Sequence, residues 1–323
     1  PGQADPCDTT GDPLSAVVAA NCASEGLVGF TQNSSVQVNQ QGGAGFGLRA
    51  ETSDNLSAGV VIRPPLPTSL GDLSLAVDYF DIEVNDAVST NSFSGVLADC
   101  YNQATGFQLG VGECAAVTRN SSDILTVVTG FRNLSAFTTE GVEGNLRYSV
   151  GIAPDVRLTA NGTLTYYIEQ AVQSEPTDAL VDYNNTIANP QWLGGFDATL
   201  EIGQIAIRYG FTFVGATDRQ NEIICTDSQN VLDQACLDQV NGLFFFETPD
   251  YFTHDLSVRF NTEDFVLTAG VRNFTDTDLP IITGGTGFGR FVNTAAGNAS
   301  NVPLGGNYDY IGRTFFLNTT FQF

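Results

Sequence analysis

Tight and long connections alternate along this chain of 323 residues. Nine segments have the composition and period of β-strands, and they lie at 54–63, 72–84, 131–150, 155–169, 195–203, 204–214, 252–262, 264–274 and 312–323. The connections between them are by turns short, at 64–71, 151–154, 203–204 and 263, and long, at 85–130, 170–194, 215–251 and 275–311. Soluble β-sandwiches follow no such rule, whereas outer-membrane barrels have short turns at one end and long loops at the other. The alternation therefore predicts an all-β protein with a transmembrane antiparallel β-barrel.

The predicted strands have a two-residue period. In 155–169, Val156 and Leu158 alternate with Arg157 and Thr159. Successive side chains of a strand point to opposite faces, so a strand of this kind has one apolar and one polar side. Charged residues of the strands fall mainly on the polar side. That side is expected to face inward, because a charge facing lipid near the midplane costs ~2–4 kcal/mol.

Strand length and aromatic position favour a membrane barrel over a sandwich, whose polar face would look to water. Most of the segments are well above the ~5–6 residues usual in soluble sheets and long enough for the ~9–11 residues of a tilted membrane strand. Aromatic residues gather at both ends of the apolar faces, as they do at the two interfaces of a membrane. They are Phe260, Phe265, Phe321 and Phe323 at the turn end, and Tyr166, Phe211, Phe213, Phe252 and Phe315 toward the loop end.

Hydropathy and charge narrow the classes of protein further. The mean hydropathy is +0.00, and no stretch approaches the ~20 apolar residues of a membrane helix. Alternating strands average out in such a scan, so a barrel remains compatible with it. The formal charge of −24 argues against nucleic acid as a partner, because the phosphate backbone would be repelled.

The cysteines form three close pairs in the sequence. Their spacing does not resemble the C-x₂-C pairs of zinc sites, and only one histidine is present to complete such a site. Local disulfide bonds formed in an oxidising compartment fit better. We therefore expect the bonds Cys7–Cys22, Cys100–Cys114 and Cys225–Cys236.

The sequence gives little indication of a catalytic or metal-binding site. His254 is the only histidine, so neither a metalloenzyme site nor a Ser-His-Asp triad is expected. We place His254 at the membrane interface or at the base of a loop. Acidic pairs such as Asp227 and Asp233 lack the spacing of an EF-hand and are interpreted as solvated acids. The sequence predicts no enzyme, no catalytic residue, no metal and no cofactor.

Three stretches of the chain resemble the C-terminal half of TonB-dependent outer-membrane receptors. The first runs from Glu51 to Ile82 and ends in Asp-Tyr-Phe-Asp-Ile, and the second runs from His254 to Asp276, similar to the family's penultimate hairpin. The third is the closing strand, which resembles the signal that the barrel assembly machinery recognises. Its candidate signal residues are Gly312, Phe315, Leu317, Phe321 and Phe323.

The resemblance implies a barrel of roughly 22 strands, of which these nine would be the last. An odd number of strands cannot close an antiparallel barrel, so we expect earlier strands and an N-terminal plug outside this chain. Residues 1–53 would be an extracellular loop leading into the barrel strands at 54–323. The implied location is the outer membrane of a Gram-negative bacterium, with the long loops extracellular.

The implied function is uptake of a scarce ligand such as a siderophore, cobalamin or a glycan. The inner-membrane TonB complex would power this uptake by pulling on the plug. The partners are then the lipid bilayer, the TonB complex, the barrel assembly machinery and the ligand, with a surface lipoprotein as a further candidate.

Aromatic residues of the long loops are the candidate ligand contacts, because aromatic rings supply rigid contact area. They are Tyr183, Trp192, Phe244, Phe245, Phe246 and Tyr251. The run Phe244–Phe246 could equally anchor its loop, and the acidic loops disfavour highly anionic ligands. Two other interpretations stay open. One is a structural or binding protein anchored at the surface by a barrel, and the other is a secreted all-β enzyme or lectin, soluble without detergent.

Overall fold

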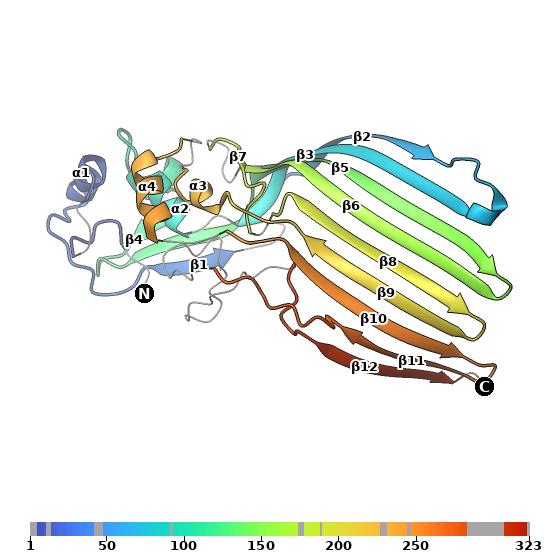
Figure 1. Ribbon diagram of the computed structural model, residues 1–323. Coiled ribbons are helices and arrows are strands. Elements are labelled where there is room, and N and C mark those ends of the chain that lie inside the picture. The colour runs from blue at the N-terminus through green and yellow to red at the C-terminus, as the bar shows by residue number, and fades with distance from the viewer. Residues whose placement is uncertain are drawn as a thin grey trace. The chain divides into compact units, whose positions relative to one another are not determined.

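The computed structural model describes residues 5–10, 14–41, 48–90, 93–173, 178–187, 189–226, 231–243, 247–282 and 307–321. Strands dominate the described chain (Figure 1). Two compact units are present, each made of two stretches of sequence. The first unit is Pro1–Thr52 with Asn85–Ser135, and the second unit is Ser53–Val84 with Ala136–Phe323.

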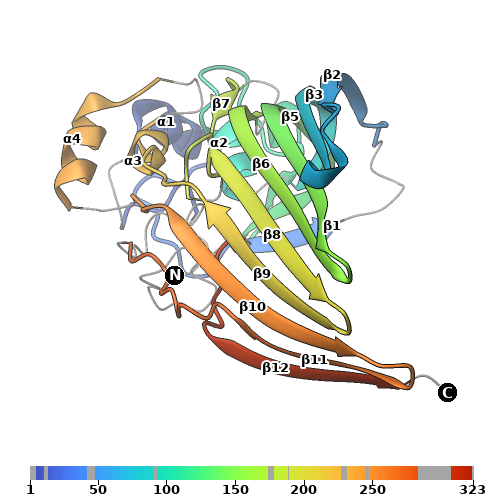
Figure 2. The ribbon, with the colours of Figure 1, turned by 45° about the vertical axis from the view of Figure 1, so that its right-hand side comes forward.

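The second unit contains an open, curved β-sheet (Figure 2). Its strands are β2 (Thr52–Ile62), β3 (Asp72–Thr90), β5 (Leu125–Ala153), β6 (Val156–Gln173), β8 (Trp192–Ile202), β9 (Ile205–Val214), β10 (Tyr251–Asn261), β11 (Phe265–Arg272) and β12 (Thr314–Phe321). Each of these strands lies beside its neighbours in chain order, and β2 and β12 form the edges of the path among the described residues. From β5 to β12 every pairing along this path is antiparallel. The nine predicted strands are confirmed, and the sheet is part of a barrel.

Two of the strands extend beyond their predicted bounds into the first unit. The predicted segments 72–84 and 131–150 extend to Thr90 in β3 and back to Leu125 in β5. The extensions belong to the first unit, where β5 also pairs with β1 (Gln37–Gln41) and β4 (Val117–Arg119). These extensions are not part of the sheet with one apolar and one polar face, so they lack the two-residue period from which the other strand residues were predicted.

Tight turns join the strands at one end of the sheet. Between β8 and β9, Ile202 pairs with Ile205, which leaves Gly203 and Gln204 as a two-residue turn. Gly203 has φ +56°, a left-handed conformation that glycine adopts without steric cost. Its N–H also donates to the carbonyl of Asp155 in the neighbouring turn, at 2.9 Å. The short turn predicted at this point is confirmed.

The register between strands keeps the two faces of the sheet distinct. Leu158 pairs with Leu200, and the adjacent pair on the other face is Arg157 with Glu201. On β10, Leu256 is 43% exposed, although side chains of a sandwich core would be buried. The apolar face is therefore turned outward, as expected for a barrel wall that meets lipid.

The first unit has its own buried core. It contains α1 (Ala16–Ser24) and α2 (Phe93–Tyr101) together with β1, β4 and the start of β5. The Ser15 side chain caps α1 by accepting a hydrogen bond from the N–H of Val18 at 3.2 Å. Disulfides lie at the centre of this core, and in the second unit a further one closes a loop. The bonds are Cys7–Cys22, Cys100–Cys114 and Cys225–Cys236, the pairing predicted from spacing.

Polar contacts hold the chain together where it leaves the first unit and where it returns. The guanidinium of Arg49 lies 2.6 Å from the Asp86 carboxylate. The Asn133 amide donates to the carbonyls of both residues, and the carboxylate of Glu51 accepts from the N–H of Val88 at 2.6 Å. The β2–β3 hairpin thus begins and ends at one tied point.

The long connections of the second unit also contain regular elements, which are β7 (Val181–Asp182), α3 (Gln220–Ile224) and α4 (Gln234–Leu243). Buried residues from these connections and from strand ends pack into a second core. Its members are Ile187, Val214, Tyr251, Ile282 and Tyr308. None of the helices in the described part of the chain combines the length and apolar character needed to cross a membrane.

Candidate functional site

The polar face of the sheet has charges of both signs. Arg208 lies 3.9 Å from Asp197, and Arg259 lies 3.9 Å from Glu201. These side chains are roughly a third to a half exposed, and such ion pairs contribute little to stability. The face is consequently a hydrated wall with neutralised charges on β8, β9 and β10.

A hollow of about 740 Å³ occupies the same face near the turn end of β2, β3, β5 and β6. Arg63, Arg147 and Asp72 line it together with the amides of Asn145 and Asn161. Among the described residues no carboxylate lies within ion-pairing distance of Arg63 or Arg147. The amides, in contrast, are engaged, because Asn145 donates to Glu143 at 2.8 Å and Asn161 donates to Asp197 at 3.4 Å.

Aromatic rings form two belts on the apolar face. At the turn end, the ring of Phe265 lies 6.2 Å from that of Phe260 and 6.4 Å from that of Phe321. At the loop end, the rings of Phe213 and Phe252 stack with their centroids 4.8 Å apart. Such girdles sit where a membrane meets water.

The distance between the belts fits a bilayer. On β10, Phe252 and Phe260 are 8 residues apart (260 − 252). At ~3.4 Å per residue they lie about 27 Å apart along the strand. A strand tilt of about 35–45° reduces this to roughly 20 Å, comparable to the ~25 Å apolar band of outer-membrane barrels.

His254 lies within the loop-end belt, which agrees with its predicted place at the interface. Its Nδ1 is 2.9 Å from the hydroxyl of Tyr209. Its ring is stacked on Phe252 and tilted against Phe211 and Phe274. The histidine is thus packed among aromatic rings on the outer side of the wall.

Trp192 also belongs to the loop-end belt. It is the first residue of β8, and its ring lies 4.6 Å from that of Tyr166, its register partner on β6. Directly paired residues share a face, so Trp192 lies on the apolar side with Leu164. The sequence analysis placed it in a loop, because the strand begins three residues earlier than the predicted start at 195.

The described connections of the second unit at 178–187, 189–191, 215–226, 247–250, 275–282 and 307–311, together with Tyr251 at the start of β10, make up what we call the loop layer. Arg219 joins two of its loops. The guanidinium donates to the Asp182 carboxylate at 2.9 Å and to the Asn184 carbonyl at 3.1 Å. It also lies 3.3 Å from Glu222, and its backbone N–H donates to the Asn185 carbonyl at 3.1 Å. Sequence reasoning missed this residue, although Arg219 is the only basic residue of 215–251 and so stands out in an acidic loop.

Asn184 anchors the loop layer to the end of β6. The side chain is 3% exposed, and its amide donates to the carbonyls of Tyr167 and Ile168 at 2.8 and 3.1 Å. Its Oδ1 accepts from the side chain of Gln170 at 3.0 Å. A buried amide with both ends satisfied fixes the backbone on either side of it.

Tyr183 and Tyr251 occupy different environments in the loop layer. Tyr183 is half-buried between Asp182 and Asn184, the two residues that Arg219 contacts. Tyr251 is 4% exposed, and its ring lies edge-on to that of Tyr308 at 5.2 Å. Tyr251 therefore packs inside the loop layer, whereas Tyr183 has an accessible side. The remaining predicted contacts, Phe244, Phe245 and Phe246, lie outside the described residues.

The candidate assembly signal lies along β12. Gly312 has φ +73°, and Phe315, Leu317 and Phe321 are 74%, 71% and 63% exposed on the apolar face of the edge strand. Phe323 lies outside the described residues. The described candidate residues of this strand are thus exposed on the apolar face.

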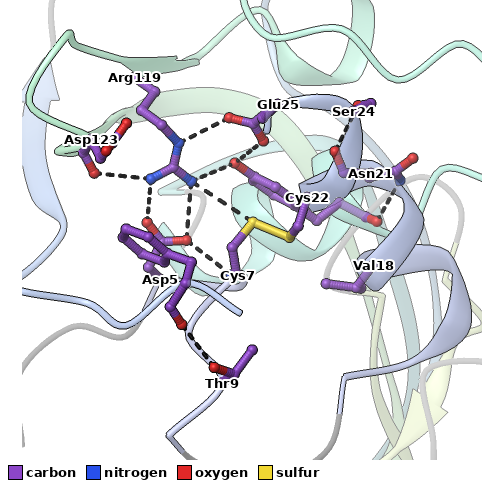
Figure 3. The surroundings of a disulfide bond; sticks show 12 residues. Asp5, Cys7, Thr9, Val18, Asn21, Cys22, Ser24, Glu25, Arg119 and Asp123 are labelled. Atoms are coloured by element: carbon purple, nitrogen blue, oxygen red, sulfur yellow. Dashed lines mark hydrogen bonds and ion pairs between the residues drawn. A yellow bond between two sulfur atoms is a disulfide. The ribbon is translucent and has the colours of Figure 1, made fainter. Parts of the chain in front are cut away.

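Arg119 forms a buried polar cluster in the first unit (Figure 3). Its guanidinium lies 2.6 Å from Asp5, 2.9 Å from Glu25 and 3.0 Å from the Tyr101 hydroxyl. The side chains of Arg119 and Asp5 are only 7% and 3% exposed. The Cys7–Cys22 disulfide lies directly beside the cluster.

Burial sets the protonation of this cluster. Burial alone would lower the pKa of Arg119, but hydrogen bonds to Asp5 and Glu25 outweigh it and raise that pKa above its ordinary value. Burial, followed by the charge of Glu25, raises the pKa of Tyr101 above 10.0. The charged and polar groups of this cluster form ion pairs and hydrogen bonds with one another. The cluster therefore stabilises the first unit and leaves none of these groups free for a ligand.

Comparison with known proteins identifies similar barrels. The family model described as TonB dependent receptor-like, beta-barrel, matches residues 23–274. The outer membrane transporter YddB from Escherichia coli is 12% identical, with 90% of this chain and 35% of that chain covered and a TM-score of 0.50. The ferric enterobactin receptor PfeA from Pseudomonas aeruginosa is 17% identical, with 86% and 32% covered and a TM-score of 0.49.

The siderophore receptor PirA from Acinetobacter baumannii is 14% identical, with 84% and 32% covered and a TM-score of 0.46. At these identities the likeness concerns the fold. The chain spans about a third of the length of these three proteins. No curated protein sequence matches it.

Proposed function

Because the chain belongs to the TonB-dependent receptor-like β-barrel family, we propose that it is the C-terminal wall of an outer-membrane transporter that takes up a scarce ligand. The observation that carries this proposal is the two-faced sheet, with aromatic belts on its apolar face and charges on its polar face. One face suits lipid and the other suits a watery interior. The family consists of receptors and transporters, and no bond of the ligand is broken in such a process.

The remainder of the barrel completes the transporter. Among the described residues β2 and β12 form the edges of the sheet, and further strands of a barrel of roughly 22 strands would cover them. A plug inside that barrel would block free diffusion, and the inner-membrane TonB complex would move it. The apolar side chains along β12 would guide insertion by the assembly machinery.

The loop layer would form the outer vestibule. Tyr183 is the described residue best placed to contact a ligand, because its side chain is partly exposed on a segment fixed by Arg219 and Asn184. Phe244, Phe245 and Phe246 remain candidates. We leave Trp192 and Tyr251 out of the proposed vestibule, since the first lies in the aromatic belt and the second is buried.

Uptake by cells tests this function. The full receptor would be produced in a Gram-negative host and offered labelled ferric siderophores, cobalamin and oligosaccharides, with and without an intact TonB complex. We expect accumulation of one ligand class that stops when TonB is absent and falls several-fold in Tyr183→Ala. Tyr310→Ala, a change to an exposed tyrosine elsewhere in the loop layer, serves as the control.

The alternative is a binding or structural protein that uses the barrel as an anchor. In that case cells would bind a ligand at the surface equally well with and without TonB, and none would enter the periplasm. Extraction of the protein from cells distinguishes a secreted all-β enzyme or lectin from a membrane barrel, because the secreted protein would stay in solution without detergent.

A further inference from the structure

Two carboxyl groups oppose each other where β5 and β6 approach the loop layer. Glu140 on β5 and Glu169 on β6 are direct register partners. Directly opposed residues of an antiparallel pair share a face, and their Cβ atoms lie about 4.5–5.5 Å apart. Two like charges in this arrangement destabilise the pairing. The sheet therefore loses stability at this point as long as both glutamates are ionised.

A β-bulge places this pair on the outer face of the sheet. Gly141 pairs with Tyr167 on the polar face. The next residue of β5, Glu140, pairs with Glu169, so β6 contains Ile168 as an extra residue. A slip of one residue moves the side chains that follow it to the opposite face. Beyond Ile168 the odd-numbered residues of β6 accordingly point outward, although those before it point inward.

Contacts with β3 agree with this assignment of the faces. The ring of Phe80 lies against Gly141 and 6.1 Å from the ring of Tyr167, on the polar face. The adjacent Tyr79 donates its hydroxyl hydrogen bond to Glu140 at 2.8 Å. Adjacent residues of a strand point to opposite faces. Tyr79 and Glu140 are therefore on the outer face.

The glutamate pair lies beyond the aromatic belt at the loop end. Tyr166, which belongs to that belt, pairs with Val142. Glu140 is two residues farther toward the loops, and at ~3.4 Å per residue this is about 7 Å along the strand. Aromatic belts mark the interface between the apolar part of a membrane and water. Both carboxyl groups are thus in the hydrated region, where they can exchange protons with water.

The surroundings of the two carboxyl groups differ. The hydroxyl of Tyr79 stabilises the charged form of Glu140 by donating to it. Glu169 has no hydrogen bond or ion pair with a described residue. The acids near it are Asp182 on β7, Glu140 on β5 and Asp81 on β3, and burial, followed by the charge of Asp182, raises the pKa of Glu169 above 4.5. Glu169 is consequently the member of the pair that takes up a proton.

Asp182 links this pair to the loop layer. Its carboxylate accepts from the N–H of Gln170 at 3.2 Å and from the guanidinium of Arg219 at 2.9 Å. The N–H of Tyr183 in turn donates to the Gln170 carbonyl at 2.8 Å. Arg219 supplies positive charge here, but Asp182 already binds it. A negative charge on Glu169 therefore repels Asp182 and opposes the contacts that attach 181–183 to β6.

We propose that Glu140 and Glu169 share one proton, and that loss of this proton loosens the loop layer from the wall. A proton on Glu169 removes one of the opposed charges and supplies an O–H donor for the Glu140 carboxylate. Release of the proton to water restores the repulsion of Glu140 and Asp182. This inference needs the wall and the loop layer but no ligand, so its test is independent of uptake.

The direction of the pH effect follows from the raised pKa. The stability that Glu169 contributes is complete below its ordinary value of 4.5 and is lost as the pH rises through the folded pKa. The loop layer should thus be attached most firmly in mildly acidic surroundings and less firmly at neutral pH.

Hydrogen exchange of the full receptor in lipid vesicles tests the proposal. Exchange would be followed from mildly acidic to neutral pH and corrected for the intrinsic pH dependence of amide exchange. Peptides covering 169–173 and 181–187 should lose protection several-fold as the pH rises, while peptides of β9 and β10 should not change. In Glu169→Gln the protection should be high and independent of pH, and in Glu140→Gln the pH dependence should shrink. Glu247→Gln, a change to an exposed acid before β10, serves as the control and should keep the original profile.

Infrared titration of the same proteins detects the proton itself. The unmodified receptor should keep a protonated-carboxyl band at higher pH than Glu169→Gln does. The shared proton is disproved if the two titrations coincide, or if Glu140→Gln keeps the full pH dependence. A band that persists while exchange of 181–187 ignores pH would overturn the link to the loop layer. Should the glutamine variants lose protection in β9 and β10, the infrared titration and exchange profile of the unmodified receptor still decide.

Discussion

Removing the positive charge of Arg119 should loosen the first unit. In Arg119→Met the carboxylates of Asp5 and Glu25 would stay buried without a positive charge beside them, since their side chains are only 3% and 12% exposed. Breaking a buried ion pair from one side costs ~3–5 kcal/mol. With ~1.4 kcal/mol for each factor of ten, local opening should rise roughly 100- to 4,000-fold.

Hydrogen exchange measured by mass spectrometry follows this opening directly. Peptides from α1 and α2 should exchange faster in Arg119→Met by the factor given above, while peptides from β9 and β10 in the second unit should not change. The triple variant Arg119→Met, Asp5→Asn, Glu25→Gln should recover part of the protection, because it leaves no buried charge unpaired.

Arg132→Met is the matched control, since Arg132 is exposed in the same unit and has no ion pair among the described residues. A surface change of this kind should alter stability by no more than about 0.5 kcal/mol. The reasoning is refuted if Arg119→Met speeds exchange less than fivefold, or if the triple variant is no better protected than the single one.

Three further predictions concern pH, the wall and the loop layer. The pKa of Tyr101 is higher in the folded protein than in the unfolded chain, so the stability that this residue contributes is complete below pH 10.0 and is lost as the pH rises through the folded pKa. Amide hydrogen exchange of the first unit should therefore accelerate above pH 10.0. The acceleration should be smaller in Tyr101→Phe. Leu256→Arg, at the middle of the apolar face of β10, should lower the unfolding free energy in lipid by ~2–4 kcal/mol, whereas the adjacent Ser257→Arg on the polar face should be tolerated; equal effects would contradict the assignment of the faces. Arg219→Ala should speed amide exchange in both 181–187 and 215–226, and Glu222→Gln, which alters only the exposed partner, should not; a change confined to 215–226 would mean that Arg219 does not couple the two loops.

The wall of the barrel could be predicted from the sequence because each strand obeys a local rule. The alternation of Val156 and Leu158 with Arg157 and Thr159 needs no knowledge of distant residues, and neither does the two-residue turn at Gly203. Cysteine spacing was similarly informative, since each disulfide closes a short loop.

The first unit could not be predicted in the same way. The helix α1 is short, and its packing depends on Cys22 and on contacts with a segment some 80 residues away, such as the hydrogen bond from Asn21 to the Tyr101 carbonyl. Short helices gain most of their stability from such packing and little from their own sequence. The sequence analysis accordingly described these stretches as loops.

Candidate site residues were harder to predict for a related reason. Aromatic composition alone could not separate Trp192, at the membrane interface, from Tyr183 in the loop layer, because the difference depends on where β8 begins and which way its first side chain points. Arg219 binds Asn184 and Asp182, which are 35 and 37 positions away in sequence, and Arg119 binds Asp5, which is 114 positions away.

The tied entry and exit of the β2–β3 hairpin has a consequence for how such a wall is built. Arg49, Asp86 and Asn133 connect the chain just before β2 to the end of β3, and these hydrogen bonds oppose a shift of one strand along the other. β2 can then keep its alignment to β3 although it is an edge strand of the described sheet. A further strand that pairs with β2 would therefore find the backbone hydrogen-bonding groups of this strand already held in place.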